Sequence, residues 1–65
     1  MNEKQAEAVA RALGGNVWNS GGEMYLVILR RSDGRVVGIS GESVCVYADE
    51  DALQSEQPLE SIILQ

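Results

Sequence analysis

The sequence contains no histidine and only one cysteine, Cys45. A single cysteine excludes a disulfide within the chain, and Cys45 with carboxylates alone would be a poor ligand set for zinc. A reactive thiol needs a histidine or a basic neighbour, whereas valines flank Cys45 on both sides. We therefore predict a buried structural cysteine, no metal site, no cofactor and no catalytic residue, and we expect that the protein is not an enzyme.

Long apolar runs are also missing from the chain. No stretch approaches the roughly 20 apolar residues that a membrane-spanning helix needs, so we expect no membrane partner. The N-terminal segment is amphipathic and contains acids, which is typical of neither a signal peptide nor a transit peptide. Together with the lone cysteine, these features predict a cytoplasmic protein.

Basic residues are absent from the second half of the sequence. The net charge is −5, and residues 36–65 carry six of the ten acids without any lysine or arginine. These acids are Glu42, Asp49, Glu50, Asp51, Glu56 and Glu60. An acidic surface favours solubility, and it can also bind a basic partner. One hypothesis is therefore an acidic inhibitor or nucleic-acid mimic, of the kind found in phages and mobile elements.

The N-terminal segment has the pattern of an amphipathic helix within a single domain, 1–65. Asn2 and Gln5 have the spacing of a capping box, and Gly14-Gly15 is a typical helix end. Between them, apolar residues recur at helical spacing: Ala6, Val9, Ala10 and Leu13. The pattern predicts a helix over 3–13 that packs on a sheet through this stripe.

Two glycine turns divide the next segment into a three-strand meander. Gly21-Gly22 and Asp33-Gly34 are both typical of two-residue hairpin loops. Such loops would pair Trp18 with Tyr25, Val17 with Leu26, Arg30 with Val37, and Ile28 with Ile39. Directly paired residues share a face, so this register assigns each side chain of the meander to one of two sides.

Both predicted sides of the meander are apolar at the centre. Side A contains Val17, Met24, Leu26, Ile28, Arg30, Val37 and Ile39, and side B contains Trp18, Tyr25, Val27, Leu29, Arg31, Val36 and Gly38. A strand follows at 43–47, then a short helical segment within 49–57 with Asp49 as its cap, and a terminal strand after Pro58. The predicted fold is α+β: an N-terminal helix on a small, mostly antiparallel sheet in the order α-β-β-β-β-short α-β.

Side B is the predicted interaction surface. We expect helix 3–13 to cover side A, while segment 49–57 is too acidic to cover side B well. The main hypothesis is a small interaction module that forms a homodimer through Trp18, Tyr25, Val27, Leu29, Arg31 and Val36. On this view Leu13→Ala destabilises the monomer more than Val36→Ala, and Val27→Glu separates the subunits without unfolding them.

Two other ligand classes rank lower on the sequence. A small-molecule pocket under Trp18 would need about 300 Å³, which so small a core rarely leaves free. Trp18, Tyr25 and Arg31 could stack on a single-stranded nucleic acid, but few arginines and a net charge of −5 make this partner unlikely to bind.

Overall fold

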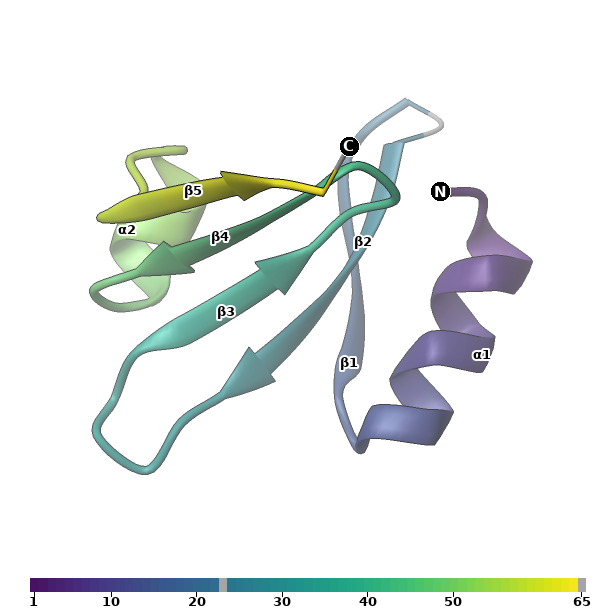
Figure 1. Cartoon of the computed structure of the whole chain (residues 1–65), viewed down its shortest axis with the longest axis horizontal. Helices are drawn as coiled ribbons and strands as arrows, with labels where there is room; N and C mark the ends of the chain where they lie inside the picture. Colours follow the sequence, from purple (N-terminus) through teal and green to yellow (C-terminus); the bar gives the residue numbers. More distant parts are fainter. Residues whose placement is uncertain (23, 65) are drawn as a thin grey trace.

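The computed structural model describes residues 1–22 and 24–64 and confirms the predicted α+β fold and order of elements. Helix α1 (Glu3–Leu13) is followed by strands β1 (Asn16–Gly21), β2 (Met24–Arg30), β3 (Val36–Ile39) and β4 (Ser43–Tyr47). A short helix α2 (Glu50–Gln54) precedes the last strand, β5 (Glu60–Ile63). The strands form one antiparallel sheet whose spatial order equals their order in the chain (Figure 1).

Helix α1 has the predicted caps. The Asn2 side chain accepts a hydrogen bond from the Gln5 N–H at 2.8 Å, and Gln5 Oε1 accepts one from the Asn2 N–H at 3.1 Å. Gly14 ends the helix in the left-handed conformation, with φ 74°. Gly15 has a different role: a Cβ there would lie 2.6 Å from the carbonyl oxygen of Ile28. Its missing side chain allows the chain to pass close to β2.

The first hairpin has a different register from the predicted one. Trp18 pairs with Leu26, not with Tyr25, because the β1–β2 register shifts between Asn19 and Gly21. The Asn19 side chain accepts a hydrogen bond from the Gly21 N–H at 2.7 Å, which stabilises this irregularity. The prediction that Trp18 and Tyr25 are cross-strand neighbours is therefore wrong.

The second hairpin is also shifted by one residue, because its loop is longer than two residues. Leu29 pairs with Val37, and the Arg31 N–H donates to the Arg35 carbonyl at 2.8 Å, so the loop contains residues 32–34. Gly34, with φ 90°, provides the positive φ that such a three-residue turn requires. The predicted pairs Arg30–Val37 and Ile28–Ile39 are wrong for this reason.

The two shifts redistribute the side chains of the meander, so sides A and B do not exist as predicted. One face of the sheet, here the α1 face, contains Val17, Tyr25, Val27, Leu29, Val37, Ile39, Val44, Val46 and Ile62. The other, here the α2 face, contains Trp18, Leu26, Ile28, Arg30, Val36, Gly38, Cys45 and Tyr47. Trp18 and Val36 thus lie on the opposite face from Tyr25, Val27 and Leu29.

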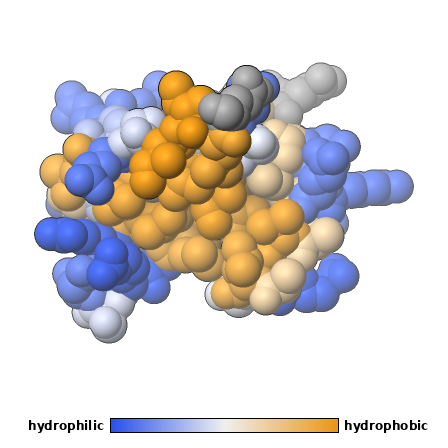
Figure 2. Space-filling model, viewed as in Figure 1, coloured by the Kyte–Doolittle hydropathy of each residue, from blue (hydrophilic) through white to orange (hydrophobic). Residues whose placement is uncertain are grey.

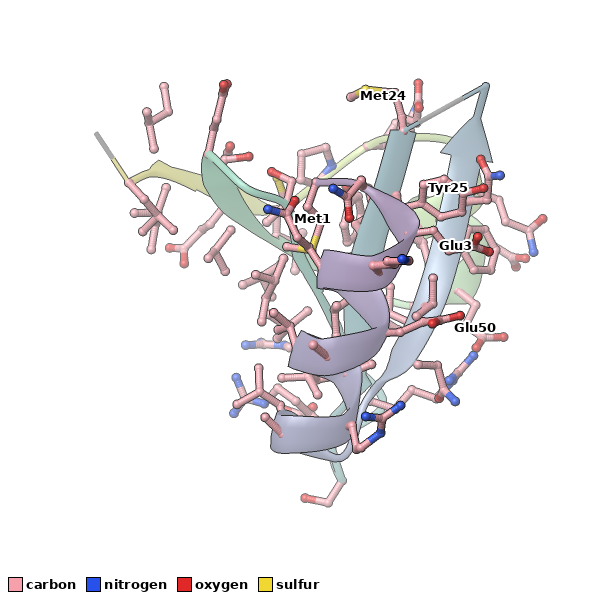
Figure 3. All side chains as sticks on the ribbon, turned by 90° about the vertical axis from the view of Figure 1, so that its right-hand side faces the viewer. Met1, Glu3, Met24, Tyr25 and Glu50 are labelled. Carbon is pink, nitrogen blue, oxygen red and sulfur yellow. The ribbon has the colours of Figure 1, made fainter. Side chains whose placement is uncertain are left out.

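Each face has a small hydrophobic core. On the α1 face, Val27 is buried against Ala6 and Ala10 of α1. Met1, Glu3 and Tyr25 lie around the first turn of that helix (Figure 3). On the α2 face, Ile28 and Val36 form a buried cluster with Leu53 of α2, which lies behind the sheet in Figure 1. Helix α1 therefore covers Val27, contrary to prediction, and Val27→Glu would place a charge in the core.

We predict that Val36→Ala lowers the free energy of unfolding by about 2 kcal/mol, whereas Leu13→Ala costs less than about 1 kcal/mol. The reason is burial: Val36 is 1 % exposed and Leu13 is 52 % exposed, which reverses the order expected from the sequence. Urea titrations of both variants at low protein concentration measure the difference. A larger loss for Leu13→Ala would contradict the observed packing.

Candidate functional site

The structure does not bring the six predicted interaction residues to one surface. Val27 and Val36 are fully buried, on opposite faces of the sheet. Trp18, Tyr25 and Leu29 are half-buried within the two cores or beside them. Arg31 is exposed at the β2–β3 turn. These six residues therefore do not form one contact surface in the folded chain.

A continuous apolar surface does exist, over the other half of the α1 face. Helix α1 lies over β1 and β2 and leaves β3, β4 and β5 without a helix on this side. Figure 2 shows the result as a broad hydrophobic area in the same view as Figure 1. We name this surface the open face; it contains Val37, Ile39, Val44, Val46, Ile62 and Leu64. Leu64 extends the pairing of β5, since its N–H donates to the Glu42 carbonyl at 2.8 Å.

The open face is well exposed towards the sheet edge. Ile62 and Leu64 have exposed fractions of 56 % and 59 %, and the other four residues are half-buried. The chain as a whole exposes 4504 Å², whereas a compact monomer of 7.0 kDa would expose about 4,000 Å².

Charges of opposite sign border the open face. Arg31 and Arg35 lie at the β2–β3 turn, and Glu60 lies on β5 opposite Val46. The Arg35 N–H donates to Asp33 at 3.0 Å, and this bond, with the charges of Arg31 and Arg35, lowers the pKa of the Asp33 carboxyl. Asp33 therefore stays ionised at neutral pH and holds both arginines at this end of the face.

The six predicted acidic residues are exposed, and Glu42 lies at the opposite end of β4 from the other five. Asp49, Glu50 and Asp51 lie at the start of α2, where Asp49 caps the helix through the Ala52 N–H at 2.8 Å. Glu56 follows the helix, and Glu60 lies on β5. Glu42 precedes β4, at the far end of that strand from α2. Within residues 1–22 and 24–64, no group of acids or Cys45 is arranged to hold a metal ion.

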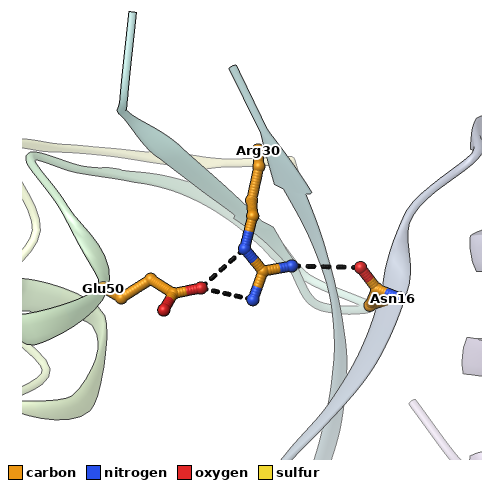
Figure 4. A network of polar contacts seen from close by, with 3 residues as sticks. All are labelled: Asn16, Arg30 and Glu50. Atoms are coloured by element: carbon orange, nitrogen blue, oxygen red, sulfur yellow. Dashed lines mark hydrogen bonds and ion pairs between the residues drawn. The ribbon is translucent and has the colours of Figure 1, made fainter. Parts of the chain in front are cut away.

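Glu50 instead connects α2 to the sheet. Arg30 Nε donates to Glu50 Oε1 at 2.6 Å, a second guanidinium nitrogen forms an ion pair with the same oxygen, and Nη1 donates to Asn16 Oδ1 at 3.0 Å (Figure 4). Both charged side chains are half exposed, so solvent screens the pair and it contributes less than about 1 kcal/mol. The network positions α2 over the α2 face more than it stabilises the fold.

A groove of about 420 Å³ lies on the α2 face, beside the part that α2 covers. Its lining comes from four strands and the end of α2: Trp18, Asn19, Met24, Leu26, Gly38, Ser40, Ser43, Cys45, Tyr47, Leu53, Gln54 and Glu56. It is larger than the space we expected so small a core to leave. Cys45 is half-buried in this groove, with its sulfur 3.4 Å from Ser61 Oγ, and is not the buried cysteine that its sequence predicted.

Comparisons with known protein families, with curated proteins and with solved structures give no match for this chain. In the part of the chain that the structure describes, no helix is long and apolar enough to cross a membrane.

We predict that Tyr47 ionises above its ordinary pKa of 10.0, because partial burial beside Cys45 disfavours the phenolate. The folded state then holds this proton more tightly than the unfolded state. Its contribution to stability is present below pH 10 and is lost as the pH rises through the higher folded pKa. Absorbance at 295 nm in a Tyr25→Phe variant reports Tyr47 alone, since the chain has two tyrosines. A midpoint at or below that of the urea-unfolded variant would contradict the burial.

Proposed function

We propose that this chain is a non-enzymatic interaction module that forms a dimer with a second copy through the open face. The observation that carries the proposal is the half of the α1 face that no helix covers, with Val44 and Val46 at its centre. Exposed apolar surface of this extent commonly marks a protein contact. A second copy is the simplest occupant, because twofold dimers are the commonest assembly.

The area requirement favours a dimer of this type. A stable interface takes roughly 600–1,000 Å² from each subunit. The open face supplies six apolar side chains, and Leu13 of α1 is a further exposed apolar residue that the proposed contact would reach. Two sheets that pack face to face would bury these side chains as the two layers of a sandwich do. Leu13, exposed in the single chain, would then lie at the edge of the contact.

Charge complementarity also supports a second copy. A twofold axis parallel to β4 exchanges the positions of β3 and β5 between the two sheets. Arg35, two residues before Val37 on β3, would then approach Glu60 on β5 of the other subunit. Opposite charges at the rim contribute little affinity, but they fix the register of a contact and favour one orientation.

Stability gives a further reason for association. The described residues contain only six buried apolar side chains, divided between two clusters on opposite faces of the sheet. So short a chain buries only about 60 % of its unfolded surface, and a second subunit adds burial without adding length. The acidic-inhibitor hypothesis stays a prediction, with five of its six residues on α2, beside it or on β5.

We predict that Ile62→Glu converts the dimer to a monomer, while Ile63→Glu leaves it intact. The two residues are neighbours on β5, but Ile62 points to the open face and Ile63 to the α2 face. Both are exposed, at 56 % and 73 %, so neither change should unfold the chain. Sedimentation equilibrium over a dilution series measures the masses, and circular dichroism checks that both variants are folded.

Two results would overturn the proposal. One is a wild-type chain that stays monomeric at millimolar concentration. The other is an equal loss of association in both variants, since pairing of β5 edges would be sensitive to either residue. The Leu13→Ala variant adds a graded test, because a residue at the edge of the contact should weaken the dimer by less than about tenfold.

A further inference from the structure

We propose that the groove on the α2 face is a binding site for a flat aromatic small molecule that is neutral or positively charged. The groove and the open face lie on opposite sides of the sheet, so this site is separate from the dimer contact. Its volume of about 420 Å³ is within the range of ligand pockets, roughly 300–1,000 Å³.

The shape of the groove suits a planar ligand. Leu26, Gly38 and Cys45 form its floor, on three adjacent strands of the sheet. Trp18 lines the groove from the neighbouring strand β1, Tyr47 lies on β4 two residues after Cys45, and Leu53 lines it from α2. Aromatic and aliphatic side chains around a flat floor favour a ring that stacks by its face or its edge.

Gly38 is the residue that lets two of the lining side chains, Tyr47 and Leu26, pack close to the sheet. It lies in the middle of a strand, where glycine is unfavourable, and its φ is not among the positive values that would require glycine. A Cβ at this position would lie 3.2 Å from Tyr47 Cε2 and 3.5 Å from Leu26 Cδ1. Glycine is therefore needed here for space between two of the lining side chains.

The charge of the lining determines which ligands fit. Among the described residues of the groove, Glu56 is the one charged side chain; the other polar groups are hydroxyls and amides. A carboxylate with no nearby base repels an anion and attracts a cation. Cations also bind favourably over the faces of tryptophan and tyrosine. An anionic aromatic molecule is therefore the ligand that this site should reject.

Two dyes that share one ring system test this inference. N-phenyl-1-naphthylamine is neutral, and 1-anilinonaphthalene-8-sulfonate adds a single negative charge. Trp18, the sole tryptophan, lines the groove and reports binding through quenching of its fluorescence. We expect saturable quenching by the neutral dye and binding of the sulfonate that is weaker by about tenfold or more.

Three variants locate the site. Gly38→Ala would displace the Tyr47 and Leu26 side chains that line the groove and should weaken binding of the neutral dye by about tenfold. Glu56→Gln, at an exposed position, should increase the affinity for the sulfonate and leave the affinity for the neutral dye unchanged. Ile62→Glu, on the opposite face, should change neither affinity.

Several outcomes would overturn the inference. These are no quenching by the neutral dye, equal affinity for both dyes in the wild-type chain, or loss of dye binding in Ile62→Glu, which would place the dye on the open face. If Gly38→Ala fails to fold, Glu56→Gln decides the question alone, because an unchanged preference between the dyes would exclude the groove.

Discussion

The burial of β2 on both of its faces is the constraint on which the rest of this structure depends. Val27 and Ile28 are neighbours in the chain with exposed fractions of 0 % and 1 %, and their side chains point to opposite sides of the sheet. A strand of this kind needs a cover on each side. Helix α1 is the cover for Val27, and Leu53 of α2 is the cover for Ile28.

Both candidate sites follow from the small size of these covers. Helix α1 presents two alanines to the sheet, so it lies close to β1 and β2 but does not extend over the other strands. Helix α2 has five residues and a single buried side chain. The open face remains because α1 covers two strands only, and the groove beside Trp18 remains because α2 is short. Within the described residues, no other helix or strand lies over either of them.

The sequence was sufficient to predict the elements but not the faces of the sheet. The capping box at Asn2, the Asp49 cap and all the strands are local patterns, and the structure confirms them. Register depends on loop length to the single residue. The irregularity between Asn19 and Gly21 and the three-residue loop at 32–34 each shift the register by one residue. No periodicity in the sequence indicates either shift.

These two register shifts explain why the predicted interaction residues do not share one face of the sheet. The sequence indicated that one apolar side would lack a cover, which holds for the open face. Most residues assigned to that side lie in the cores or beside them, and the predicted interaction surface did not include the apolar residues of β4 and β5. Val44 and Val46 on β4, and Ile62 and Leu64 after Pro58, recur at every second position. This spacing is the sequence pattern that indicates a shared apolar face.

The strand order has a consequence for how the chain folds. Every strand pairs with its neighbour in the sequence, and α1 packs on the two strands that follow it. The strand pairings therefore close short connections, which lowers the entropic barrier to forming the sheet, whereas Leu53 of α2 packs on residues farther away in the sequence. The chain can assemble one hairpin at a time, and each hairpin is the template for the next strand. Such a meander should reach its native state rapidly as a single chain, before any second copy is encountered.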